Sequence, residues 1–156
     1  MQIQLINVAQ KLPGWVEDGC ADYARRIPRE LGLAQVTVPV ASSRSLQSAE
    51  KRRDREAEQI IAKLRPGSLN IALEDSGKAW TSLEWSSQLQ RWMQEYSQVN
   101  LIIGGPDGLS GRCLSVCQQR VSLGRMTMPH ALVKVVLLEQ LYRAWSISQG
   151  HPYHRE

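Results

Sequence analysis

Apolar positions follow two alternating patterns along this chain. Short runs such as 69–73 and 101–103 are aliphatic without interruption and are flanked by turn residues, as buried parallel strands are. Longer stretches between them have apolar residues at helical spacing. The alternation predicts an α/β domain with a mainly parallel sheet. We expect strands at 3–8, 36–40, 69–73, 100–103 and 121–123, and helices at 15–26, 48–65, 81–96, 110–119 and 131–149.

Several helix ends are marked by capping residues. Thr81 and Glu84 have the spacing of a capping box, and Ser110 can cap the helix that follows it. Gly150 and Pro152 end the last helix. The first helix contributes three candidate core residues, Trp15, Tyr23 and Ile27.

The second helix is highly charged, and two interpretations of it remain open. Its segment 51–56 carries both signs of charge, so pairs such as Arg52–Glu56 suit a solvated face. Alternatively, Arg44 and the residues Lys51 to Arg53 contact the phosphates of RNA. We favour the solvated face for most of these side chains.

Three polar or glycine-rich loops, 74–78, 104–110 and 124–130, follow predicted strands. Ligands of open α/β sheets bind at the carboxyl ends of strands. Gly104, Gly105 and Gly108 would let a ligand approach the backbone closely, although a simple tight turn explains this glycine cluster equally well.

The last helix is apolar around nearly its whole circumference, which predicts burial on all sides. A small domain rarely covers such a helix alone, so we expect a homodimer with this helix in the interface. Glu139, Arg143 and Ser146 form a polar stripe on it. The pair Glu139–Arg143 is either a structural interface pair or a means of presenting the Arg143 guanidinium to RNA or to a reacting carbonyl.

All three histidines fall late in the sequence, at 130, 151 and 154. Tyr153, His154 and Arg155 place an aromatic ring, a group that titrates near neutrality and a cation side by side. This combination suits recognition chemistry, but chain ends commonly fray and composition alone favours a frayed tail.

Length and composition exclude several classes of protein. The 156 residues suffice for one domain, 1–156, and no apolar run is long enough to span a membrane. We find no signal peptide in the sequence. It also lacks a phosphate-binding P-loop, a dinucleotide fingerprint and a nucleophile elbow. The three cysteines suit buried thiols in a reducing cytosol, and no metal site can be assembled from the sequence. A net charge of +4 weakly favours an anionic partner such as RNA.

Four separated motifs carry a resemblance to a known family along nearly the whole chain. They are 101–109 (LIIGGPDGL), 127–130 (TMPH), 139–144 (EQLYRA) and 151–155 (HPYHR). In this order they resemble the bacterial large-subunit rRNA pseudouridine N3-methyltransferases, small members of the SPOUT class. The resemblance implies a cytoplasmic homodimer with a C-terminal trefoil knot, although general topology rules argue against knots. It also implies a pseudouridine substrate in 23S rRNA within the assembled ribosome, with no role for DNA, a membrane or a metal.

The resemblance further implies S-adenosylmethionine as methyl donor, held by the three loops. The matching positions are Leu73, Gly104, Leu123, Gly124, Arg125, Met126, Thr127 and Met128. Gly124 and Arg125 depart from the family pattern, which often has a serine followed by a small or apolar residue. Contacts through the backbone would survive this change, whereas a side-chain contact at Gly124 would not.

For catalysis we expect His154 to remove the N3 proton, and Arg143 or Arg155 to stabilise the developing negative charge. Tyr153 would stack on the flipped base. If positioning supplies most of the rate, His154 is instead a binding residue. A ribosome-binding factor without activity and a ribose 2′-O-methyltransferase of the same class remain alternatives.

Overall fold

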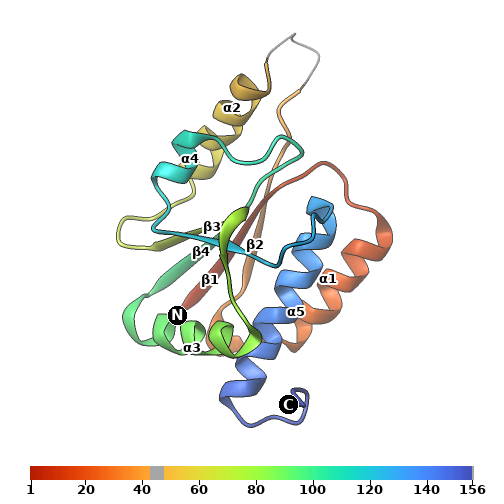
Figure 1. Ribbon diagram of the computed structural model, residues 1–156, viewed down its shortest axis with the longest axis vertical. Coiled ribbons are helices and arrows are strands. Elements are labelled where there is room, and N and C mark those ends of the chain that lie inside the picture. Colours follow the sequence, from red (N-terminus) through yellow and green to blue (C-terminus); the bar gives the residue numbers. More distant parts are fainter. Residues whose placement is uncertain (43–47, 156) are drawn as a thin grey trace.

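A computed structural model describes residues 1–42 and 48–155 and has five strands between two layers of helices (Figure 1). The predicted strict alternation of strand and helix is confirmed. Arg44 lies outside the described residues. The strands are β1 (Gln2–Val8), β2 (Ala34–Val38), β3 (Leu69–Ala79), β4 (Gln98–Ile103) and β5 (Gln119–Ser122); the helices are α1 (Gly14–Arg26), the 3-10 turn η1 (Arg29–Leu31), α2 (Ala49–Ile61), α3 (Ser82–Glu95), α4 (Gly111–Ser115) and α5 (His130–Ser148).

All neighbouring strands of the sheet are parallel, and their order is β2-β1-β4-β3-β5. The central strand β4 is buried at every residue, as its uninterrupted apolar run predicts. Because all strands run the same way, their carboxyl ends lie at one edge of the sheet. In the sheet β3 lies between β4 and β5, so the segment after the apolar run of β3 is brought together with the loops after β4 and β5.

The helices cover both faces of the sheet. Helices α1, α3 and α5 pack on one face over a core that includes Trp85, Leu137 and Leu141, whereas α2 and α4 cover a smaller core on the other face. The capping box at Thr81 and the Ser110 cap are both confirmed. The prediction that Trp15 belongs to the core is wrong, because its side chain is 63% exposed on α1.

A ladder of buried amides fixes the register at the amino ends of the central strands. Asn100 of β4 is fully buried and donates to the Asn70 Oδ1 of β3 (2.8 Å) and to the Ser68 hydroxyl (2.9 Å). Gln98 donates to Asn100 (2.8 Å) and to Gln4 of β1 (3.0 Å). Buried amides are stable only when they are hydrogen-bonded, so a shifted register would leave them unsatisfied.

Strand β3 is longer than the sequence predicts. The residues 74–78 were expected to form a polar bend, but they continue the strand and pair with β5 after a shift in register between Leu73 and Lys78. Gly77 makes this second pairing possible, because a Cβ atom there would lie 2.5 Å from the Val121 nitrogen. Helix α4 is shorter than expected and ends at Ser115.

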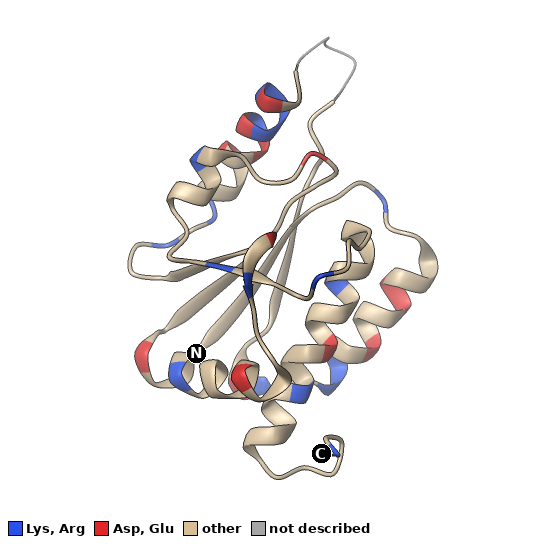
Figure 2. Cartoon of the chain, in the orientation of Figure 1, with Lys and Arg blue, Asp and Glu red and all other residues tan. Residues whose placement is uncertain are grey.

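Helix α2 carries side chains of both charges along its length (Figure 2). The sequence predicts Arg52–Glu56 as a solvated pair, but neither side chain is fully exposed to solvent. Glu56 is buried and its carboxylate accepts a hydrogen bond from the Ala41 amide (3.1 Å), while Arg52 forms an ion pair with Asp107. Burial raises the pKa of Glu56 above its ordinary value. Within the described ranges, no helix is both long enough and apolar enough to cross a membrane.

Candidate functional site

A cavity of about 420 Å³ opens beside residues 73–76 of β3 and beyond the carboxyl ends of β4 and β5, next to the start of α5. The structure brings together residues from all three loops that the sequence singled out. Two of the candidates in the loop after β5, Arg125 and Thr127, are exposed and lie outside the cavity lining. The candidates that line the cavity are Leu73, Gly104, Leu123, Gly124, Met126 and Met128.

The bend after β4 is shaped by its glycines. Gly108 has φ +78°, a left-handed conformation that favours glycine, and it pairs with Gly105 in a short antiparallel bridge. A Cβ atom at Gly104 would lie 2.8 Å from the carbonyl carbon of Gly108. The bend therefore folds back on itself, and the backbone of its glycines forms part of the cavity wall.

The loop after β5 begins with a local turn made by Ser122. The Ser122 hydroxyl donates to the Gly124 carbonyl oxygen (2.7 Å) and accepts from the Gly124 amide (3.2 Å). Gly124 has φ +142°, which a residue with a side chain rarely adopts. Glycine at this position therefore suits the turn, whatever becomes of a side-chain contact to a ligand.

Polar residues that sequence reasoning did not assign to this cavity also line it. Arg53 reaches it from α2, and the carboxylates of Glu74, Asp75 and Asp107 and the ring of His130 are part of its wall. The order of strands and helices could not reveal Arg53, because α2 lies about fifty residues before the glycine bend. Glu74 and Asp75 were not named singly, but they belong to the segment 74–78 that the sequence marks as a candidate ligand-binding loop.

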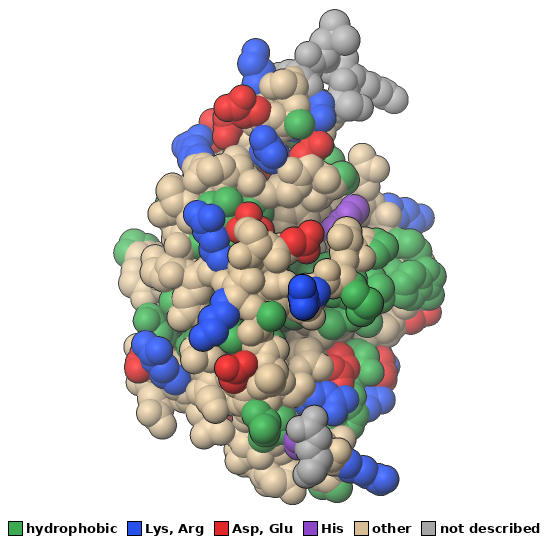
Figure 3. All heavy atoms as spheres, viewed as in Figure 1, with side chains coloured by type: hydrophobic (Ala, Val, Ile, Leu, Met, Phe, Trp, Pro, Cys, Tyr) green, Lys and Arg blue, Asp and Glu red, His purple; other side chains and the backbone are tan. Residues whose placement is uncertain are grey.

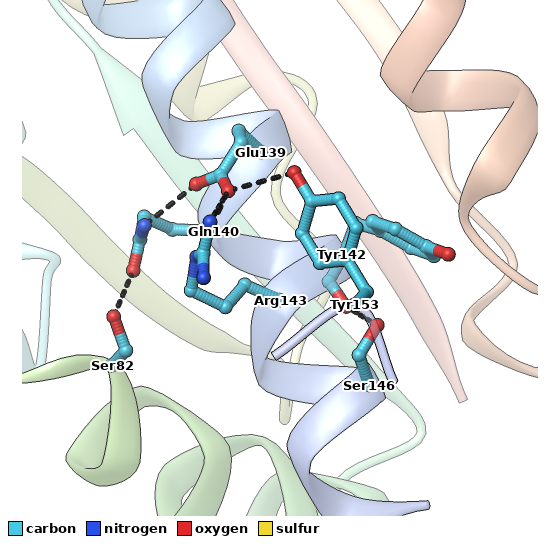
Figure 4. A network of polar contacts seen from close by, with 7 residues as sticks. All are labelled: Ser82, Glu139, Gln140, Tyr142, Arg143, Ser146 and Tyr153. Atoms are coloured by element: carbon cyan, nitrogen blue, oxygen red, sulfur yellow. Dashed lines mark hydrogen bonds and ion pairs between the residues drawn. The ribbon is translucent and has the colours of Figure 1, made fainter. Parts of the chain in front are cut away.

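A second polar cluster is centred on Glu139 of α5 (Figure 4). Its Oε1 atom accepts from the Arg143 Nε (2.9 Å) and Nη2 (2.6 Å) and from the Tyr153 hydroxyl (3.0 Å). Its Oε2 atom accepts from Gln140 (2.6 Å), which in turn accepts from Ser82 of α3 (2.8 Å). The predicted pair Glu139–Arg143 is therefore present, and it anchors the tail of the chain to α5.

The residues after α5 pack against it, contrary to the frayed tail that composition favours. The Tyr153 ring lies 4.7 Å from the Tyr142 ring and 5.0 Å from the Arg143 guanidinium carbon. Burial, followed by hydrogen bonding to Tyr23 and Glu139, raises the pKa of the Tyr153 phenol well above its ordinary value. His154 is half-buried, and Arg155 is exposed.

The structure does not bring the tail cluster to the cavity within one chain. Arg143, Tyr153, His154 and Arg155 are all absent from the cavity lining. Val133 lines the cavity near the start of α5, and a helix rises about 1.5 Å per residue, so Arg143 lies about 15 Å further along the axis. Figure 1 shows the C-terminus beyond the far end of α5.

Apolar side chains gather on the side of the molecule that α1 forms, over the start of that helix (Figure 3). A hollow of about 630 Å³ adjoins α1 and the edge strand β2, and Lys134 of α5 lines it although this side chain is buried. Lys134 is not among the residues that the sequence singles out, because α5 is apolar around nearly its whole circumference. No residue of α5 is fully exposed even in the single chain.

Within residues 1–42 and 48–155, no three His, Cys, Asp or Glu side chains are grouped as a metal ion would need.

Comparison with known proteins identifies relatives that match the entire chain. A family model described as "Predicted SPOUT methyltransferase" matches residues 1–154. A protein of Hahella chejuensis named "Ribosomal RNA large subunit methyltransferase H" is 45% identical over 156 residues and is covered completely, as is this chain. Proteins with the same name from Azotobacter vinelandii (39% over 155 residues) and Hydrogenovibrio crunogenus (40% over 156 residues) cover 99% and 100% of this chain, respectively.

Solved structures share the fold at low sequence identity. A Bordetella pertussis protein described as a "Probable Methyltransferase" superposes with a TM-score of 0.58 at 17% identity, covering 91% of this chain and 95% of its own. A Legionella pneumophila protein described as a "putative methyltransferase" and solved with bound S-adenosylmethionine superposes with a TM-score of 0.51 at 14% identity, covering 92% of this chain and 66% of its own. At these identities the likeness concerns the arrangement of strands and helices.

Proposed function

Because this chain belongs to the SPOUT methyltransferase family, we propose that it transfers a methyl group from S-adenosylmethionine to N3 of a pseudouridine in 23S rRNA. The observation that carries the proposal is the full-length match to relatives named as large-subunit rRNA methyltransferases, at up to 45% identity. The cavity supports it as well, since residues 73–76 and the loops after β4 and β5, where the resemblance implies that the donor binds, line it together.

The cavity suits S-adenosylmethionine in both size and chemistry. Leu73, Leu123, Met126 and Met128 offer apolar surface for an adenine ring, and the backbone at Gly104 is open to polar groups. Two buried polar atoms of cavity residues, the Arg53 Nε and the Glu74 Oε2, make no hydrogen bond among the described residues, although the Glu74 Oε2 lies 4.0 Å from the Arg120 Nη1 in an ion pair. S-Adenosylmethionine supplies an electrophilic methyl group on a positively charged sulfur. We propose Leu73, Gly104 and the loop 123–128, which includes Gly124, Arg125 and Thr127, as the residues that hold it.

We assign proton removal, charge stabilisation and stacking on the base to residues of α5 and the tail. His154 would accept the N3 proton of the pseudouridine, and Arg155 would stabilise negative charge on the flanking carbonyl oxygens. Arg143 already donates twice to Glu139, so it also serves to position the tail. The raised pKa of Tyr153 keeps its phenol protonated, and we therefore assign the Tyr153 ring a stacking role and not that of a base.

We further propose that the chain is a homodimer in which the tail of one subunit completes the cavity of the other. Within one chain the two groups of residues lie at different ends of α5, so they cannot share a substrate unless a second copy brings them together. The exposed Trp15 and the half-buried apolar residues of α5 supply surface for such an interface.

The finer features of the family complete the proposal. The single domain 1–156 would contain a trefoil knot in its C-terminal part, where β3 passes in close contact with β5 at Gly77 and α5 returns against α1 and α3. The proposed site of action is the cytoplasm, and the substrate is rRNA in the assembled ribosome. We assign no DNA, membrane or metal partner.

The test uses radiolabelled S-adenosylmethionine with ribosomes that lack this methyl group, and with free rRNA in parallel. The label is mapped by nuclease digestion and mass spectrometry. We expect it on the base of a pseudouridine, and only with ribosomes. Label on a ribose would contradict the named reaction while keeping the class. Absence of transfer, together with absence of donor binding by calorimetry, would favour a ribosome-binding factor instead.

A further inference from the structure

Helix α2 is fastened to the glycine bend by two successive arginines. The Arg52 Nε lies 2.9 Å from the Asp107 Oδ2, and the Arg52 Nη2 lies 3.4 Å from the Asp107 Oδ1, so the guanidinium spans both carboxylate oxygens. Arg53 donates from Nη1 to the backbone carbonyl oxygen of Asp107 (3.3 Å). A helix far away in the sequence thus becomes part of the cavity wall.

The two arginines are used differently. Arg52 neutralises the Asp107 carboxylate, whereas Arg53 contacts Asp107 only through its main chain. Arg53 is the one lysine or arginine in the lining of the cavity as the structure describes it. Its Nε–H is buried without a hydrogen-bond acceptor among the described residues. A buried donor of this kind is costly unless a ligand supplies the acceptor.

The methyl donor has the complementary group. S-Adenosylmethionine carries one anionic group, the carboxylate of its methionine part, beside a cationic ammonium and sulfonium. A guanidinium binds a carboxylate through paired N–H donors. Glu74 and Asp75 belong to the same lining and carry carboxylates that suit the two positive groups, and Glu74 also forms a 4.0 Å ion pair with Arg120.

We infer that Arg53 binds the carboxylate of the methyl donor, and that the Arg52–Asp107 pair holds α2 in the position from which Arg53 reaches it. This inference rests on the proposed function and adds a residue outside the three strand-end loops. Arg53 is then a specificity residue, which distinguishes amino-acid-bearing adenosine compounds from adenosine compounds without a carboxylate.

The experiment compares two ligands by isothermal titration calorimetry. S-Adenosylhomocysteine retains the carboxylate, and its decarboxylated analogue keeps the adenosine and the ammonium. We expect Arg53→Leu to raise the Kd for S-adenosylhomocysteine about tenfold, the order of a charge-assisted hydrogen bond. The Kd for the decarboxylated analogue should stay within about twofold of the wild-type value. The preference of the wild type for the carboxylate would disappear. Arg53→Lys keeps the charge and should retain part of the preference.

Arg55→Leu is the matched control, because Arg55 lies exposed on the same helix. It should bind both ligands as the wild type does. Equal weakening of both ligands by Arg53→Leu would overturn the inference in favour of a structural role, and unchanged binding would overturn it outright. An effect confined to the KM for ribosomes at saturating donor would overturn it by assigning Arg53 to an RNA phosphate. Failure of the wild type to bind S-adenosylhomocysteine would instead overturn the proposed function.

Discussion

Glu139 determines what its neighbours on the tail can do. One of its oxygens accepts three hydrogen bonds, from two nitrogens of Arg143 and from the hydroxyl of Tyr153. Buried charges persist when they are paired and hydrogen-bonded in this way. The cluster holds the Tyr153 ring against α5, so the neighbouring His154 starts from a defined position and not from a frayed end.

His154→Ala tests the assignment of the proton acceptor. A positioned general base contributes about 100-fold or more to a rate, so we expect a loss well above tenfold in single-turnover methyl transfer. Binding of the donor, measured by calorimetry, should change little, because the proposed partner of His154 is N3 of the pseudouridine and not the donor. A loss below tenfold would make His154 a binding residue.

The Arg52–Asp107 pair predicts a dependence of stability on pH. The Arg52 guanidinium lowers the pKa of Asp107 in the folded protein. The contribution of the pair is therefore fully present above the ordinary carboxyl pKa and is lost as the pH falls through the lowered value. The Tm difference between the wild type and Asp107→Asn should be constant above about pH 5 and should shrink towards pH 3. A difference of the same size at pH 3 and pH 7 would contradict this assignment.

At the scale of elements, the close passage of β3 over β5 depends on a single glycine. A Cβ atom at Gly77 would lie 2.5 Å from the Val121 nitrogen and 2.6 Å from the Arg120 carbonyl carbon, which are backbone atoms that cannot turn aside. Gly77→Ala should destabilise the fold by about 1–3 kcal/mol, as overpacking at a fixed site does.

Gly111→Ala is the control for this prediction, since nothing lies within 4 Å of the added Cβ and its φ is not left-handed. Denaturant unfolding of both variants measures the difference. A Gly77→Ala variant as stable as Gly111→Ala would show that the two strands can separate without cost.

The alternation of strand and helix could be predicted because most elements carry a local sequence signal, such as the apolar run of β4 or the capping box at Thr81. The continuation of β3 through Gly77 could not be predicted, because polar residues around a glycine have the composition of a bend. Only pairing with β5, a strand forty residues later, makes this segment extended. Arg53 was similarly hidden, since its partner at Asp107 is distant in the sequence.

At the scale of the whole molecule, the cavity and the tail residues of the proposed site lie at opposite ends of α5. The loop residues could be located from the sequence because parallel strands bring their carboxyl ends together. The separation of Tyr153 and His154 from these loops could not, because it depends on the length of α5 and on the packing of the tail against Glu139. Under the proposed function, assembly of two copies would be required for the chemistry.

Mixed dimers test this requirement directly. Leu123→Trp would fill the cavity, and Tyr153→Ala would remove the aromatic ring of the tail. Each variant alone should be nearly inactive, and calorimetry should show donor binding lost only in the first. Both should keep a Tm near that of the wild type, which makes their mixture interpretable.

The decisive measurement is methyl transfer by an equimolar mixture of these two variants after subunit exchange. If tail and cavity come from different subunits, half of the dimers are mixed and each has one intact site of two, so about one quarter of wild-type activity returns. If both come from the same chain, every site carries one defect. Activity no greater than that of the separate variants would then contradict the proposed assembly.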